Sequence, residues 1–209
     1  MSSTAMQARQ EQPDDIAGPF GMWVVLASEV LFFGGLLLAY AYGRGHWPAG
    51  FAAGSRETHV VIGTVNTALL LTSSALVALA VACGESRDGR SRVPALLWGA
   101  CVLGLAFLAL KGVEYAKEFH GHLVPGASFR LQDEPGAQLF YVLYFLATGL
   151  HAVHLTIGIA ILAVFAHGSR RLKGWAVPPR IEAAGLYWHF VDVVWIFLYP
   201  LIYLGGRSG

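Results

Sequence analysis

The stretch at residues 20–42 reads FGMWVVLASEVLFFGGLLLAYAY, and Glu29 is the only charged residue within it. About 20 apolar residues in a helix are enough to cross the hydrocarbon core of a bilayer, so the stretch predicts a membrane-spanning helix. An unpaired carboxylate at that depth costs roughly 3 kcal/mol or more. Glu29 therefore predicts polar partners elsewhere in the chain and marks a candidate functional position.

The whole chain has the composition of a membrane protein. Of its 209 residues 56% are hydrophobic and 13% are charged, whereas a soluble domain carries about 25% charged residues. The net charge of +1 gives no reason to expect nucleic-acid binding. Cys83 and Cys101 lie in or at the ends of apolar runs without CxxC spacing, so we interpret them as small hydrophobic residues.

Five apolar runs are long enough to span a bilayer, at about residues 20–42, 60–83, 94–116, 137–166 and 182–204. Only helices and closed barrels satisfy the backbone in lipid. We therefore predict an all-α membrane protein, with one five-helix transmembrane bundle at 20–205 after a polar cytoplasmic tail at 1–19. The segments between the runs are rich in Gly, Pro and charge, and we interpret them as loops: 43–59, 84–93, 117–136 and 167–181.

The distribution of Lys and Arg predicts the orientation. With a cytoplasmic amino terminus, the inside segments hold eight of these residues and the outside segments hold five, Lys111 not being counted because it lies within a helix. The positive-inside rule thus favours a cytoplasmic amino terminus and a periplasmic carboxyl terminus.

Polar side chains on four of the predicted helices fall in one layer, about 10–22 Å from the cytoplasmic side at a rise of about 1.5 Å per residue. They are Glu29, Ser73, Ser74, His151, His154, His189 and Asp192. Three interpretations are open. The layer is a self-satisfied polar core that fixes helix packing, a carboxylate–histidine site coupled to proton movement or to lipid headgroups, or a haem or metal site.

The haem interpretation rests on His151, His154 and His189, which could supply axial imidazoles from two helices. The remaining histidines lie in loops or at helix ends, and the acidic neighbours Glu29 and Asp192 are unusual beside a haem. A zinc or iron site needs a tighter ligand set than the spacing indicates. We therefore predict no metal ligands in this chain.

A second polar layer is predicted near the outer face. Lys111 and Glu114 are three residues apart on the third helix, Glu118 follows, and Asn66 lies near the same side of the second helix. Lys111 either extends to the interface or forms an intramembrane pair with Glu114 that holds its helix to its neighbours.

Taken in order, these segments resemble subunit III of the haem–copper cytochrome oxidases. The matching strings are SEVLFF at 28–33, NT at 66–67, TSS at 72–74, KGVEY at 111–115, TGLHAVH at 148–154 with Gly158, and YWHFVDVVW at 187–195. They cover about residues 20–205. The chain is similar to a short bacterial form of the family, because only a short polar segment precedes the first helix.

The resemblance implies a subunit of the bacterial inner membrane without redox centres, the haem and copper being held by partner subunits. Such a subunit packs against subunit I in a complex that also contains subunit II, binds phospholipid, and supports proton uptake and the durability of the enzyme. The family's helix-1 carboxylate corresponds to Glu29. The lipid-filled cleft between the two-helix and five-helix parts of longer members is not expected within this chain alone.

Three alternatives remain at this point. One is an accessory protein of the same family linked to nitric oxide reduction. Another is a membrane anchor that binds haem b or quinone, which an optical spectrum would reveal. A small proton-coupled transporter is disfavoured, because the sequence has no inverted repeat and no pair of broken helices.

Overall fold

The computed structural model describes residues 14–86, 89–171 and 178–207. Its elements are α2 (Asp14–His46), α3 (Pro48–Glu57), α4 (Val60–Glu85), α5 (Val93–His120), α6 (Ala137–Arg171), α7 (Pro178–Tyr199) and the π-helical turn η1 (Pro200–Leu204). The parts long and apolar enough to cross a membrane are Leu26–His46, Val60–Glu85, Val93–His120, Ala137–Gly168 and Ile181–Leu204. The prediction of an all-α bundle with five membrane helices is therefore confirmed.

Two segments differ from the prediction. Segment 43–59 is not wholly a loop, because it contains α3. This helix begins at Pro48, and proline is favoured there because the first residues of a helix need no N–H for intrahelical hydrogen bonds. Gly54 lets α3 lie against α6, since a Cβ atom there would fall 2.5 Å from Phe140 Cδ1. In addition, α2 begins at Asp14, so part of the predicted tail is helical, while residues 1–13 lie outside the described residues.

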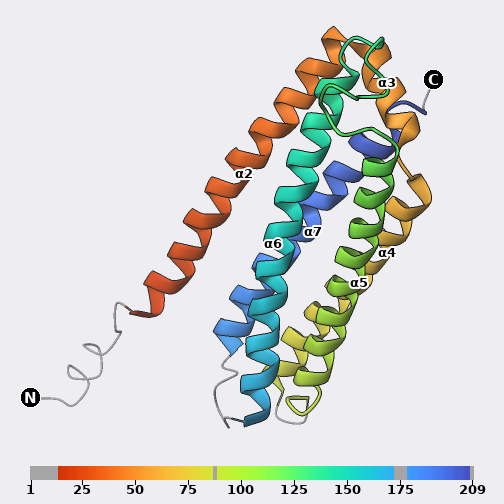
Figure 1. The fold of residues 1–209 in the computed structure, drawn as a ribbon. Helices are drawn as coiled ribbons and strands as arrows, with labels where there is room; N and C mark the ends of the chain where they lie inside the picture. Colours follow the sequence, from red (N-terminus) through yellow and green to blue (C-terminus); the bar gives the residue numbers. More distant parts are fainter. Residues whose placement is uncertain (1–13, 87–88, 172–177, 208–209) are drawn as a thin grey trace, which may run out of the picture.

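Figure 1 shows α4, α5, α6 and α7 running side by side, while α2 leans away from them toward its amino-terminal end. The buried side chains of α2 recur every seventh residue, at Leu26, Phe33 and Tyr40, so one face of the helix is turned to the bundle. The loop 121–136, α3 and the carboxyl-terminal residues cover the opposite end of the bundle (Figure 1).

Trp188 of α7 is fully buried at the centre of the bundle. Two glycines make room for its indole. A Cβ atom at Gly104 of α5 or at Gly158 of α6 would lie within about 3.1 Å of Trp188 ring atoms. The ring nitrogen donates a hydrogen bond to Ser73 Oγ of α4 at 3.2 Å, so this one side chain joins all four helices.

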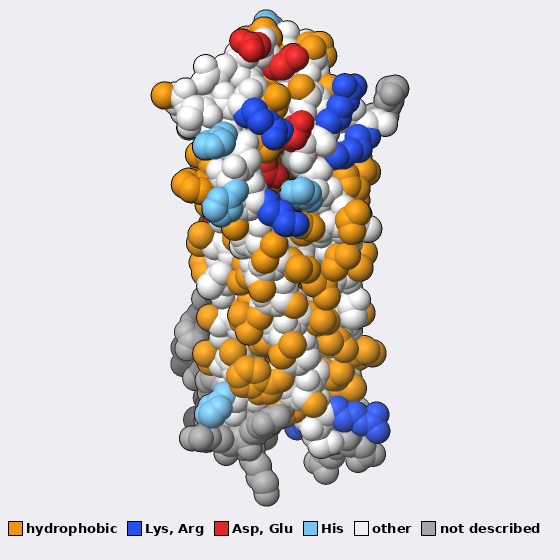
Figure 2. Space-filling view, turned by 45° about the vertical axis from the view of Figure 1, so that its right-hand side comes forward, with side chains coloured by type: hydrophobic (Ala, Val, Ile, Leu, Met, Phe, Trp, Pro, Cys, Tyr) orange, Lys and Arg blue, Asp and Glu red, His pale blue; other side chains and the backbone are white. Residues whose placement is uncertain are grey.

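The outer surface is apolar along the length of the bundle. Figure 2 shows hydrophobic side chains over the middle of the molecule and most of the charged and histidine side chains gathered at the α3 end. Large apolar side chains are exposed on every span, for example Leu31, Val61, Val102, Val153 and Phe197. A surface of this kind faces lipid or other membrane helices rather than water.

Candidate functional site

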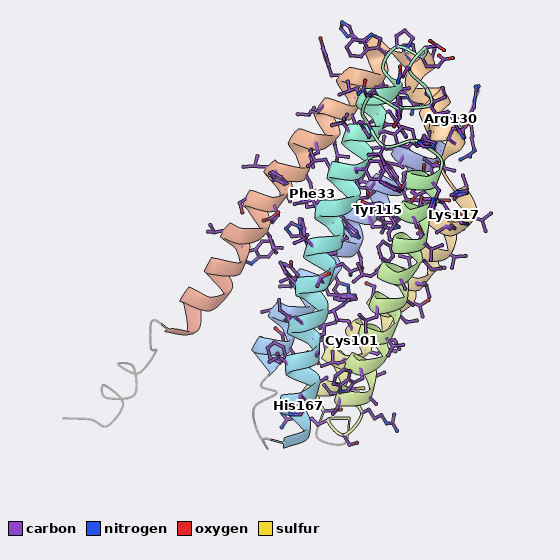
Figure 3. All side chains as sticks on the ribbon, in the orientation of Figure 1. Phe33, Cys101, Tyr115, Lys117, Arg130 and His167 are labelled. Atoms are coloured by element: carbon purple, nitrogen blue, oxygen red, sulfur yellow. The ribbon has the colours of Figure 1, made fainter. Side chains whose placement is uncertain are left out.

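Glu29 and His154 form an ion-pair contact between α2 and α6. Glu29 Oε2 lies 3.0 Å from His154 Nε2, and both side chains are largely but not fully buried, at 24% and 14% exposure. The imidazole also packs edge-on against Phe33, with ring centroids 5.4 Å apart. Figure 3 shows Phe33 on the side of α2 that faces α6. The carboxylate that the sequence marked as costly in lipid is therefore placed beside a polar partner.

The second ring nitrogen of His154 determines how the pair is protonated. Nδ1 lies 2.9 Å from the backbone oxygen of Leu150, which can only accept a hydrogen bond. Nδ1 must therefore carry a proton, and in a neutral ring Nε2 would then be an acceptor. Because carboxylate Oε2 is also an acceptor, their contact requires one further proton between Nε2 and Oε2. A hydrogen bond between the two side chains can therefore form with the proton on either Nε2 or Oε2.

His151 points elsewhere. It is 1% exposed and lies between the rings of Phe107 and Trp195, at centroid distances of 5.6 Å and 5.1 Å. Its nitrogens form no hydrogen bond with the part of the chain that the structure describes. Residues three apart on a helix differ by about 60° in direction. That offset turns His154 toward α2 and His151 into the interior.

His189 and Asp192 belong to the seam between α4 and α7. His189 Nδ1 lies 2.7 Å from Ser74 Oγ. Asp192 is 3% exposed and lies beside the same serine, although its carboxylate oxygens form no hydrogen bond of ordinary geometry among the described residues. Of the other residues predicted in this layer, the described contacts bring His154 alone to Glu29. The single predicted layer is therefore divided between the α2–α6 seam, the α4–α7 seam and the interior position of His151.

The second polar layer forms a buried ion pair. Lys111 Nζ lies 3.1 Å from Glu114 Oε2, and the two side chains are 4% and 0% exposed, so Lys111 does not extend to the interface. Lys111 also donates to the hydroxyl oxygens of Tyr144 at 3.2 Å and Tyr203 at 2.8 Å. The Tyr203 hydroxyl in turn donates to Glu114 Oε1 at 2.7 Å. The ammonium group also lies 4.7 Å from the centroid of the Tyr144 ring.

Asn66, predicted in this layer, is buried on α4, but its amide forms no hydrogen bond with any described residue. The tyrosines were missed by the sequence reasoning. Tyr144 lies three residues after Tyr141 on α6, and such a polar pair within a predicted span was a usable signal. Tyr203 follows Pro200 in the π-helical turn. This turn has more residues than an α-helical turn, so an α-helical periodicity gives the wrong direction for the Tyr203 side chain.

An apolar groove of about 220 Å³ lies between α2 and α7. Its walls include Val30, Gly34 and Leu37 from α2 and Phe190, Val193 and Phe197 from α7. Glu29 immediately precedes Val30 and Phe33 also lines the groove, so the Glu29–His154 pair lies next to it. The apolar groove and the polar pair are therefore neighbours along α2.

Among the described residues, no three His, Cys, Asp or Glu side chains are grouped so that they could hold a metal ion. His154 is engaged by Glu29 and Leu150, and His189 contacts Ser74. The arrangement offers hydrogen-bonding groups and an apolar surface.

The family model described as Cytochrome c oxidase subunit III matches residues 16–207. The chain is 31% identical to Cytochrome c oxidase subunit 3 of Thermostichus vulcanus, over 99% of this chain and 95% of the relative. It is 32% identical to the protein of that name from Alkalihalophilus pseudofirmus, over 90% and 87%. It is also 31% identical to Heme-copper oxidase subunit I+III of Aeropyrum pernix, over 88% of this chain and 22% of that protein. The chain belongs to the cytochrome c oxidase subunit III family.

Proposed function

We propose that this haem–copper oxidase subunit III is a supporting subunit that supplies no redox centre. It packs against subunit I, in a complex that also contains subunit II, and holds phospholipid at the groove between α2 and α7. The relative in which subunits I and III are joined supports the contact with subunit I. The haem and copper of the complex belong to its partner subunits.

The observation that carries this proposal is the Glu29–His154 pair beside the apolar groove. The groove walls are hydrocarbon, and part of the surface of both polar side chains remains exposed. An acyl chain fits such a groove, and a headgroup or ordered water can hydrogen-bond to the pair. The shared proton also makes the pair suitable for delivering protons toward a partner that consumes them.

We place the chain in the bacterial inner membrane with the amino terminus in the cytoplasm. The excess of Lys and Arg on that side supports the orientation. The Glu29–His154 pair then lies within the membrane, and the α3 end faces the periplasm. Reporter fusions at the two termini test this placement, and reporters on the same side would contradict it.

Lipid retention tests the proposed groove. Native mass spectrometry of the purified oxidase should show that Val193→Trp, which fills the groove, releases a phospholipid retained by the unmodified complex. Val102→Trp is the matched control, since Val102 is exposed on α5, outside the groove. Equal lipid retention in the Val193→Trp complex, the control complex and the unmodified complex would contradict lipid binding at this groove.

A further inference from the structure

Glu118 lies in the last turn of α5, on the α3 side of the buried ion pair. It is 1% exposed and follows Glu114 by four residues, so the two carboxyl groups share a helix face. Glu118 faces the hydroxyl of Tyr141 on α6, which is fully buried. Neither group forms a hydrogen bond of ordinary geometry within the described part of the chain. These are two adjacent buried polar groups without the partners that such groups normally have.

The charges around Glu118 determine its chemical state. The ammonium of Lys111 already compensates the carboxylate of Glu114, which it contacts at 3.1 Å. A second ionised carboxylate would leave the buried group with one uncompensated negative charge, at a cost of several kcal/mol. A neutral carboxyl group avoids that cost. It also gains an O–H donor, which the Tyr141 oxygen can accept, while the Tyr141 hydroxyl can donate to the carbonyl oxygen.

An exposed ion pair at the α3 end acts on the same two groups. Arg130 and Glu57 form an ion pair at the α3 end, at 47% and 41% exposure, and both act electrostatically on Tyr141. Figure 3 shows Arg130 nearer the α3 end than Lys117, the residue that precedes Glu118 in α5. The titratable and charged groups that face Glu118 and Tyr141 are Lys111 and Glu114 from α5, Tyr144 from α6, Tyr203 from η1, Glu57 from α3, and Arg130 from the loop 121–136.

We propose that Glu118 and Tyr141 form a proton-binding site at the α3 end of the bundle. The carboxyl group of Glu118 holds one proton and exchanges it with the adjacent aqueous phase past Tyr141 and the Arg130–Glu57 pair. On release, the O–H bond of the carboxyl group breaks and its electron pair stays on the carboxylate. The proton passes to a water molecule of that phase. The site is separate from the Glu29–His154 pair and does not depend on the role proposed for the groove.

Infrared difference spectroscopy of the assembled oxidase tests this site. Subtracting the spectrum of a Glu118→Gln complex from that of the unmodified complex at neutral pH should leave one carbonyl band of a protonated carboxyl group. In deuterium oxide this band should shift, because the proton exchanges with the aqueous phase. Glu114→Gln checks the charge argument. It leaves the Lys111 ammonium without its carboxylate, so Glu118 should ionise and the protonated-carboxyl band should weaken.

Tyr141→Phe provides the second variant, since it removes only the phenol oxygen. It should keep the band and shift its frequency, because the carboxyl group loses its hydrogen-bond partner. The proposal is overturned if the Glu118→Gln difference contains no such band, if Tyr141→Phe leaves its frequency unchanged, or if the band does not respond to deuterium oxide. Failure of the Glu118→Gln complex to assemble would also contradict it, because the amide replaces a neutral acid with little change of shape.

Discussion

Replacing Lys111 with Met tests how strongly the buried ion pair holds the bundle together. The ammonium group contacts Glu114, Tyr144 and Tyr203 at 3.1, 3.2 and 2.8 Å. These partners come from α5, α6 and η1, so the contact joins three elements. Met has a similar volume and unbranched shape, and therefore the substitution removes the charge while largely preserving the packing.

The size of the effect follows from what happens to Glu114. Without the ammonium, its carboxylate keeps only the Tyr203 hydroxyl among the partners described for it. Removing one partner of a buried pair costs about 3–5 kcal/mol. Glu114 can avoid part of this cost by taking a proton, which costs an ordinary glutamate about 3–4 kcal/mol at pH 7. We therefore expect a loss of about 3–4 kcal/mol in the free energy of unfolding.

Titration of the full chain with sodium dodecyl sulfate in mixed micelles at pH 7 measures this loss through tryptophan fluorescence. The control is the double variant Lys111→Met, Glu114→Leu. It leaves no buried charge of the pair and should recover most of the lost stability, since apolar replacement of both partners is often nearly neutral. Surface substitutions usually change the free energy of unfolding by less than about 0.5 kcal/mol. A change that small for Lys111→Met would refute the reasoning about the buried pair.

Three further predictions concern other parts of the molecule. Gly54→Ala should destabilise the chain by about 1–3 kcal/mol in the same titration, because its Cβ atom would lie 2.5 Å from Phe140 Cδ1. The matched control for Gly54→Ala is Gly112→Ala, which has nothing within 4 Å of its Cβ position and should be neutral or slightly stabilising. Arg207→Ala removes donors to three backbone carbonyls and should lower stability by about 1–2 kcal/mol, seen as earlier proteolysis at the carboxyl terminus. Glu29→Ala should leave the first turnovers of the assembled oxidase unchanged in stopped-flow measurements, and a slowed first turnover would contradict a supporting role.

The membrane helices could be predicted from the sequence, and so could the positions within them where a charged side chain needs a partner. Long apolar runs specify spans because backbone polar groups must be satisfied inside the membrane. For the same reason a lone carboxylate such as Glu29 identifies a position that needs a partner. The helix α3 was missed, because ten residues of mixed polarity with Gly and Pro show the pattern of a loop. Its stability comes from packing against α6, which no local pattern encodes.

The pairing of the polar residues could not be predicted from depth along the helices. Depth allowed either His151 or His154 to lie near Glu29, but rotation about the α6 axis separates them, and helix rotation depends on tertiary packing. The same limit applies to His189, which contacts Ser74 on α4. Tyr203 was missed for a different reason. The π-helical turn after Pro200 changes its direction and brings its hydroxyl to the Lys111–Glu114 pair.

Comparison of the oxidase purified with and without this chain tests its supporting role most directly. Haem and copper content per subunit I and the initial rate of oxygen reduction should be equal in the two preparations. Under sustained turnover the preparation without the chain should lose activity sooner, because proton supply and lipid packing at subunit I are weakened. Loss of haem or copper together with the chain, or identical activity throughout sustained turnover, would contradict the account.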